Sequence, residues 1–265
     1  MKKRIYSIAL CAVTTLILAA ANAQAEYYPD QYHGDPTLWS PFAPPSANPD
    51  VYGDGYDVNG INVTVVGNKL VVTLDGEYFN TWGNSSNGAG AIYAPGSLFL
   101  GTEGWNPYGT GPNYVEDNKF TSGTLWNYAI TLDGANQFDP VTNKPVTSGT
   151  ASLYSTQDGT IKDGDLRINQ IAWFDPNGQP LVTQDMGWTL DAAAGTLTIT
   201  MELPDGFLDN IDNLAYYWTM LCANDVVAGE IPLGSGSNPV PEPTTMLLFG
   251  AGLIGLAGVA RRRIS

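Results

Sequence analysis

The chain has 265 residues and a formal net charge of −15, with 26 acidic residues against 11 basic ones. Six of the basic residues but only one acidic residue, Glu242, lie in the two terminal segments described below, so the part between them carries five basic and 25 acidic residues. Such an acidic surface repels nucleic acid and anionic lipid headgroups and attracts divalent cations, which excludes a nucleic-acid-binding protein.

The first 25 residues have the pattern of a secretory signal peptide. Residues 2–4 are basic, residues 5–21 are apolar, and Ala23-Gln24-Ala25 is a small-x-small cleavage site. We therefore expect export and cleavage after Ala25. The triplet Ala21-Asn22-Ala23 offers an alternative site two residues earlier.

A proline-rich segment, residues 26–49, separates the signal peptide from the first strand pattern. It holds six prolines together with several aromatic residues. Prolines favour extended backbone, so this composition predicts an extended arm outside the main domain.

Residues 50–233 show the alternation of a β-domain. Apolar residues at 197, 199, 201 and 203 alternate with polar ones, as in a half-buried strand. Gly67-Asn68 joins two β-rich runs as a tight hairpin, because both residues tolerate positive φ. We expect strands at 61–66, 69–74, 91–100, 126–132, 150–155, 167–174, 196–203 and 214–222. With frequent Asp-Gly and Asn-Gly turns and no long helical pattern, the prediction is an all-β fold, a jelly-roll-like antiparallel β-sandwich.

The sequence offers little for catalysis. The single histidine, His33, lies in the proline-rich arm, which leaves no material for a zinc site with two histidines. A glycosidase needs only two carboxylates, and Glu77, Glu103, Glu116 and Asp117 are the candidates. Because 25 acidic residues produce such pairs by chance, we expect no enzymatic activity and no catalytic residues.

Two acidic clusters are candidates for calcium. Asp54, Asp57 and Asn59 resemble the oxygen-rich start of a calcium loop, but the EF-hand pattern is incomplete. Asp163 and Asp165, with Asp158 nearby, form the second cluster. The alternative for both is an Asx-Gly turn without metal. We expect no required cofactor, and structural calcium stays open.

Aromatic residues in polar loops are candidates for sugar binding. Trp82 lies in a Gly/Asn/Ser-rich stretch and Trp105 in another, and exposed indoles beside polar groups suit a sugar face. Trp126, Trp173 and Trp218 lie on strand patterns and are expected in the core.

One cysteine, Cys222, follows the signal peptide, so the domain cannot form an internal disulfide. It alternates with Leu214, Tyr216, Trp218 and Met220 on one side of an expected strand, which favours burial as a small hydrophobic residue. The alternative is a thiol that cross-links two chains.

The C-terminus carries a second processing pattern. Residues 234–239 form a Gly/Ser linker, Pro241-Glu242-Pro243 excludes helix at the entry, residues 246–260 are apolar, and Arg261, Arg262 and Arg263 close the run. Residues 240–265 resemble the PEP-CTERM sorting signal of Gram-negative bacteria. The second half of the domain also resembles uncharacterised passenger domains that precede this signal, which implies no activity.

The resemblance implies an exosortase, a membrane transpeptidase, as partner, a transient transmembrane helix at 244–260, and delivery to the cell surface or extracellular matrix. We therefore expect a structural role associated with biofilm or exopolysaccharide. The alternative is a calcium-assisted carbohydrate-binding module, with extracellular polysaccharide as its partner.

Overall fold

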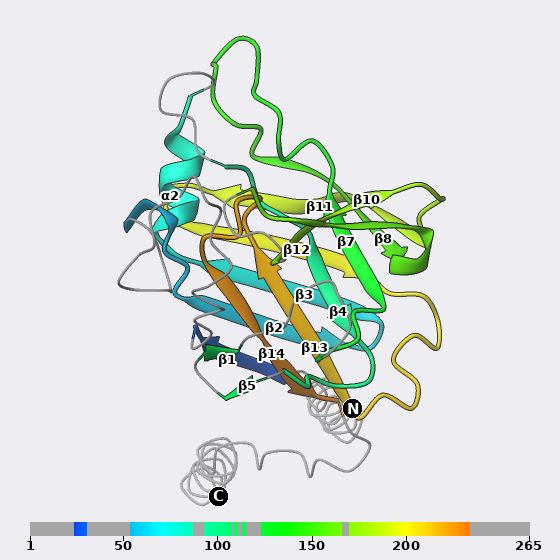
Figure 1. Ribbon diagram of the computed structural model, residues 1–265. Coiled ribbons are helices and arrows are strands. Elements are labelled where there is room, and N and C mark those ends of the chain that lie inside the picture. The colour runs from blue at the N-terminus through cyan, green and yellow to red at the C-terminus, as the bar shows by residue number, and fades with distance from the viewer. Residues whose placement is uncertain are drawn as a thin grey trace, which may run out of the picture. The chain divides into compact units, whose positions relative to one another are not determined.

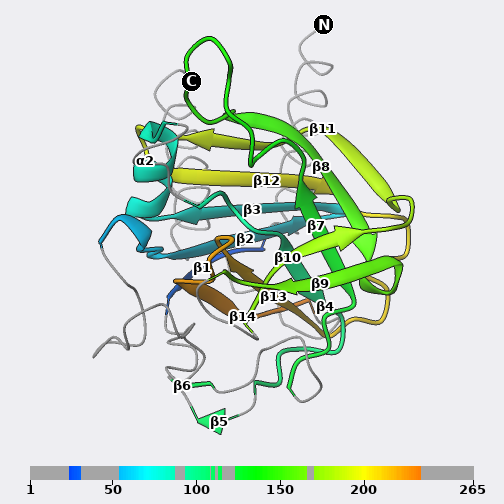
Figure 2. The same cartoon turned by 45° about the horizontal axis from the view of Figure 1, so that its top comes forward.

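The computed structural model describes residues 24–30, 54–86, 93–107, 109–110, 113–114, 123–165 and 170–233. All of them belong to one compact unit, Ala23–Gly234. Ten strands form one antiparallel sheet (Figures 1 and 2), in the order β1-β2-β3-β12-β11-β8-β7-β4-β13-β14. Their bounds are β1 (Gln24–Pro29), β2 (Gly60–Val66), β3 (Lys69–Asp75), β4 (Leu98–Gly101), β7 (Tyr128–Leu132), β8 (Ser148–Ser155), β11 (Val182–Asp191), β12 (Thr196–Glu202), β13 (Asn213–Thr219) and β14 (Val226–Pro232).

Shorter elements complete the described part. They are the strand pairs β9 (Gly159–Asp163) with β10 (Ile171–Pro176) and β5 (Gly109–Thr110) with β6 (Asn113–Tyr114), the helix α2 (Glu77–Asn84), and the 3-10 turns η2 (Asp54–Tyr56) and η3 (Thr156–Asp158).

The antiparallel all-β prediction is confirmed, but the strands do not divide into the two large sheets of a sandwich. One continuous sheet curls until its edges approach each other, and the ring of Tyr28 on β1 lies 5.7 Å from that of Tyr216 on β13. Antiparallel neighbours joined by short turns, such as Gly67-Asn68 between β2 and β3, stay in one sheet, and the right-handed twist accumulates along it.

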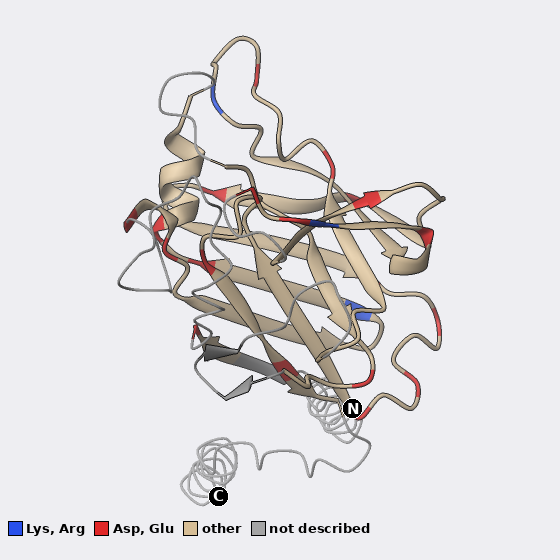
Figure 3. Ribbon diagram, viewed as in Figure 1, with Lys and Arg blue, Asp and Glu red and all other residues tan. Residues whose placement is uncertain are grey.

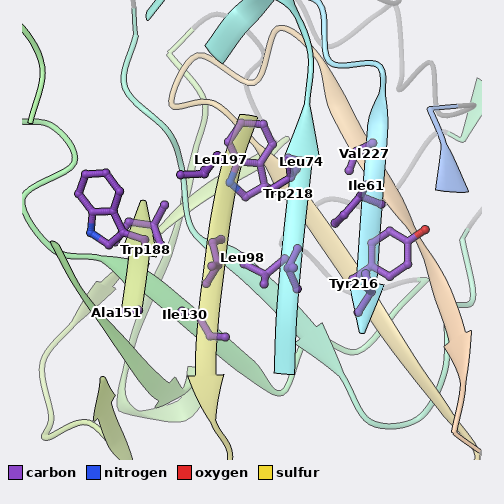
Figure 4. Packing of buried hydrophobic residues seen from close by; sticks show 14 of the residues in the cluster. Ile61, Leu74, Leu98, Ile130, Ala151, Trp188, Leu197, Tyr216, Trp218 and Val227 are labelled. Atoms are coloured by element: carbon purple, nitrogen blue, oxygen red, sulfur yellow. The ribbon is translucent and has the colours of Figure 1, made fainter. Parts of the chain in front are cut away.

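The concave face of this sheet encloses the main core (Figure 4). On β3, Leu70, Val72 and Leu74 are buried while the residues between them are half-buried, and β12 repeats the pattern. The predicted burial of the apolar stripe at residues 214–222 is also confirmed, because all five of its apolar residues belong to the main core. The strand itself ends at Thr219, so Met220 and Cys222 lie in the turn that follows β13.

The hairpin β9–β10 covers the opposite face of the sheet over β4, β7 and β13. A second hydrophobic cluster lies there, which includes Phe99, Tyr217 and Phe174. β4 and most of β13 are therefore buried on both faces. Of the three tryptophans expected in the core, Trp218 belongs to the main core and Trp126, which precedes β7, to this second cluster. The expectation is wrong for Trp173 on β10, which is half-buried and belongs to neither cluster.

The sheet has two ends that are referred to below. The termini end carries the start of β1, the Gly67-Asn68 turn, the 203–212 loop and the end of β14. Asn68 Nδ2 donates a hydrogen bond of 2.8 Å to Asp205 Oδ1 there. The α2 end carries α2, residues 54–59 and residues 220–225. Because ten strands alternate in direction, β1 begins and β14 finishes at the same end.

Candidate functional site

The first acidic cluster lies at the α2 end, where hydrogen bonds within the protein hold it. The backbone carbonyl of Asp57 accepts the Tyr78 N–H at 3.0 Å. Asn59 Nδ2 donates to Asp75 Oδ2 at 3.3 Å. These contacts join the loop before β2 to the end of β3 and the start of α2.

Asp225 is a buried carboxylate that sequence reasoning did not single out. Its side chain is 1% exposed. Oδ2 accepts the Val58 N–H at 2.7 Å, and Oδ1 accepts the Val226 N–H at 2.8 Å. Its backbone carbonyl accepts a hydrogen bond from the Thr219 hydroxyl. Asp225 therefore ties the 54–59 loop to the turn between β13 and β14, which are far apart in the sequence.

The second acidic cluster is divided by the structure. Asp163 and Asp165 flank Gly164, where an added Cβ would lie 2.4 Å from the Cβ of Ala223. Asp158 stands before β9 and Asp163 ends it, so at about 3.3 Å per residue they lie roughly 16 Å apart. Asp158 therefore does not belong to one site with the other two.

The metal prediction is neither confirmed nor excluded by this geometry. Across the described ranges, no three His, Cys, Asp or Glu residues gather closely enough to hold a metal ion. Backbone carbonyls and Asn oxygens also bind calcium. Calcium at Asp54, Asp57 and Asn59, or at Asp163 and Asp165, stays a prediction.

Tyrosines surround Cys222 at the α2 end. Tyr78 is fully buried and its hydroxyl donates to the Tyr93 carbonyl at 2.8 Å. Burial, then the neighbouring Cys222 and Tyr56, raises the pKa of Tyr78 well above its ordinary value of 10.0. Cys222 itself is fully buried, which confirms the interpretation as a core residue and leaves its thiol inaccessible for cross-linking.

Trp82 does not offer an exposed indole, so this part of the sugar-binding prediction is wrong. It lies on α2, is 1% exposed, and stacks on Tyr78 with ring centroids 6.4 Å apart and planes 6° from parallel. Positions 78, 79 and 82 follow helical spacing and place three large rings on the buried face of α2. The Gly- and Asn-rich composition had suggested a loop there.

Trp105 is half-buried in a loop at the termini end. Its backbone N–H donates to Glu230 Oε2 of β14 at 2.8 Å, and its side chain packs against the second hydrophobic cluster. The Thr102 N–H donates to Asn127 Oδ1 at 2.9 Å, and the Asn106 N–H to Thr124 Oγ1 at 3.0 Å. Side-chain acceptors thus fix the loop backbone on both sides of the indole. Sugar binding at Trp105 stays a prediction.

An open hollow of about 490 Å³ lies at the α2 end, between the end of α2 and the loop before β8. The Lys144 ammonium donates to the Asn84 carbonyl, which satisfies an acceptor at the helix C-terminus. Hydrogen bonds from Thr142, then from the Val141 N–H, lower the pKa of Asp139. Both charged groups that line this hollow therefore stabilise its own walls.

Of the carboxylates considered for a glycosidase, the two that the structure describes, Glu77 and Glu103, are not brought together. Glu77 begins α2 at one end of the sheet, and Glu103 follows β4 at the other end. Paired glycosidase carboxylates lie about 5–10 Å apart, whereas the seven residues of β3, which runs between the two ends of the sheet, span about 23 Å. Glu116 and Asp117 lie outside the described residues, as does His33.

Acidic residues are spread over the loops and strand ends of the described domain (Figure 3). Lys69, Lys144 and Lys162 are the basic residues in the described ranges. Lys162 Nζ lies 3.5 Å from Asp175 Oδ2, across the hairpin β9–β10. This partly exposed pair offsets little of the negative charge.

The sorting residues Pro241, Glu242, Pro243 and Arg261–Arg263 lie outside the described residues, as do residues 1–23 of the predicted signal peptide and most of the proline-rich arm, whereas Gln24 and Ala25 form the start of β1. Residues 26–29 of that arm form most of β1 and are paired with β2. Of the helices within the described ranges, none has the length and apolar character needed to cross a membrane, and the expected span at 244–260 lies beyond them.

Comparison with known proteins identifies the C-terminal segment. Residues 239–263 match the family model described as the PEP-CTERM protein-sorting motif. No curated protein and no solved structure matches the chain. The motif confirms the recognised sorting signal and indicates an exported protein that an exosortase, a membrane protein, sorts to the cell surface.

Proposed function

We propose that the chain has a structural role at the cell surface or in the extracellular matrix, associated with biofilm or exopolysaccharide. The observation that carries the proposal is the sorting motif at residues 239–263. A strongly acidic domain behind an N-terminal signal-peptide pattern agrees with an extracellular place of work. The buried residues of the domain include Trp82, Cys222 and Asp225, which therefore serve packing and stability. This supports a structural scaffold in preference to an enzyme.

Intact-mass measurement of the surface-associated protein tests the processing. We expect a mature chain that starts at Glu26 and lacks Val240 and everything after it. The apolar run of residues 246–260 is shorter than the ~20 residues that span a bilayer, which suits a temporary anchor. A mature protein that retains Arg261–Arg263 would refute processing.

The role itself is tested by gene deletion, with biofilm and floc formation as the measurement. Replacing Arg261–Arg263 by serine should keep the protein in the membrane fraction and reproduce the deletion phenotype. The matched control is Lys144→Ser, which removes a basic residue from the folded domain and should leave sorting unchanged. Normal biofilm in the deletion strain would contradict the structural role.

A calcium-assisted carbohydrate-binding module is the second candidate. It is favoured by the fixed loop around Trp105, since a preorganised aromatic surface binds sugars without an ordering cost. Retention of the exported domain on polysaccharide gels should fall with Trp105→Ala and with chelator. The exposed Leu125→Ala variant at the same end should be retained as the parent is. Absence of retention on any gel would remove this candidate.

A further inference from the structure

β1 can leave the main sheet without breaking any other strand pair in the described domain. It lies at one edge and pairs with β2 alone, from Gln24↔Val65 to Pro29↔Gly60. β14, at the other edge, follows β13 through a short turn at residues 220–225. In contrast, residues 30–59 connect β1 to β2, so β1 is tethered by a much longer stretch of chain.

The place that β1 occupies is shaped to receive it. The Tyr28 ring packs against the main core, beside Tyr216. At Gly60, an added Cβ would lie 2.5 Å from the Tyr28 carbonyl oxygen and 2.7 Å from the Tyr27 hydroxyl. The Asp30 N–H donates to the Asn59 carbonyl at 2.8 Å. We call this surface, formed by the edge of β2, Gly60 and Tyr216, the β1 groove.

Signal-peptide removal would make β1 a free-ended strand. Cleavage after Ala25 leaves Glu26–Pro29 and removes the pairs at Thr64 and Val65. Four paired residues hold such a strand less firmly than six, and weakly held edge elements open locally at low free-energy cost. A strand with a free end also enters a groove without threading a loop.

We propose that β1 is exchanged between copies of this chain, so that residues 26–29 of one copy occupy the β1 groove of another. The contacts in the groove are the same in the closed and the exchanged form, so concentration decides between them. For a segment joined to its own binding site by a stretch of chain, the effective concentration is on the order of millimolar. Dilute chains therefore stay closed, whereas chains crowded at a surface or in a matrix exchange. Reciprocal exchange gives dimers, and head-to-tail exchange gives open chains.

This inference deepens the structural role proposed above and rests on it for its biological use. The exchange itself is a property of the exported chain in solution. Its test uses purified residues 26–239, so its failure leaves the sorting and the biofilm experiments untouched.

Complementary variants test the exchange. Gly60→Val fills the groove of a chain whose β1 is intact, and deletion of residues 26–29 empties the groove of another. Each alone should be monomeric by light scattering, and the mixture should form a one-to-one complex at hundreds of micromolar. Adding Tyr28→Asp to the Gly60→Val chain is the matched control and should abolish the complex. Two folded variants that never associate would overturn the proposal.

A disulfide measurement covers the case in which either variant fails to fold. Tyr27 and Asn62 face each other across β1 and β2, so Tyr27→Cys with Asn62→Cys reports the docked strand. On oxidation, the share of covalently linked dimers should rise with protein concentration, while Tyr27→Cys alone should give no such rise beyond random cross-linking. Links that stay within one chain up to millimolar concentration would refute exchange.

Discussion

Asp225 offers the sharpest test of how the α2 end is held together. Its two carboxylate oxygens accept the N–H groups of Val58 and Val226, and both of these residues are 1% exposed. Asp225→Ala leaves two buried donors without these acceptors. Each hydrogen bond to a charged group is worth about 1.5–3 kcal/mol, so the loss of two should lower the free energy of unfolding by about 3–6 kcal/mol. For a domain of this size, where 1 kcal/mol corresponds to about 2–4 °C, that lowers Tm by about 6–24 °C.

Denaturant unfolding of the exported domain measures this effect. Asp225→Asn keeps one acceptor oxygen and should cost less, about 1.5–3 kcal/mol. The exposed Asp209→Asn removes one negative charge elsewhere and should change stability by less than about 0.5 kcal/mol. If Asp225→Ala costs less than 1 kcal/mol, about the value of one ordinary hydrogen bond, the carboxylate does not hold the loop as described.

Three further predictions use thermal or denaturant unfolding of the same domain. Millimolar Ca²⁺ should raise Tm more than Mg²⁺ does, with Asp57→Ala or Asp163→Ala removing the difference, and equal effects of both ions and of NaCl would reduce it to screening. Trp82→Ala should cost about 3–5 kcal/mol because it empties a core site, whereas Trp105→Ala should cost clearly less. The unfolded chain releases the Tyr78 proton near pH 10, while the folded chain, whose pKa is raised by burial, retains it. Stability should therefore fall as pH rises above 10, and Tyr78→Phe should flatten that fall.

Local sequence patterns were sufficient for the strands that have one buried face. The Gly67-Asn68 turn and the alternation on β2, β3 and β12 predicted their bounds to within a residue. Period-two alternation is a property of each strand alone, so no tertiary information was needed. The alternation on β13 predicted its start to within a residue but not its end, because the buried stripe continues through Met220 and Cys222 into the turn that follows Thr219.

Other elements depend on contacts that no local pattern records. α2 has Gly76 at its N-cap and no side-chain cap, so the sequence gives no start signal. The close approach of Gly76 to the Asp57 carbonyl and the burial of Tyr78 and Trp82 hold the helix instead. Asp225 was missed for a similar reason, because one of many acidic residues is distinguished only by the loop that folds over it. The curling of all ten strands into one sheet likewise depends on the approach of its two edges, which no pattern within a single strand records.

The even number of antiparallel strands decides where both processed ends leave the domain. β1 begins at the termini end, and β14 ends there beside Asn213. The loop that carries Trp105 is bonded to β14 through Glu230 at this same end. Linker residues 234–239 span at most ~20 Å when extended, so only a short stretch of chain separates the sorting motif from the end of the sheet that carries the candidate sugar-binding indole.

The β1 groove runs along β2 from the termini end to the α2 end, where β1 is held at Asn59 and Gly60. Because residues 30–59 join β1 at the α2 end, β1 can move away from the termini end and toward a neighbouring copy. An odd number of strands would have put the C-terminal linker and the free end of β1 at opposite ends of the sheet.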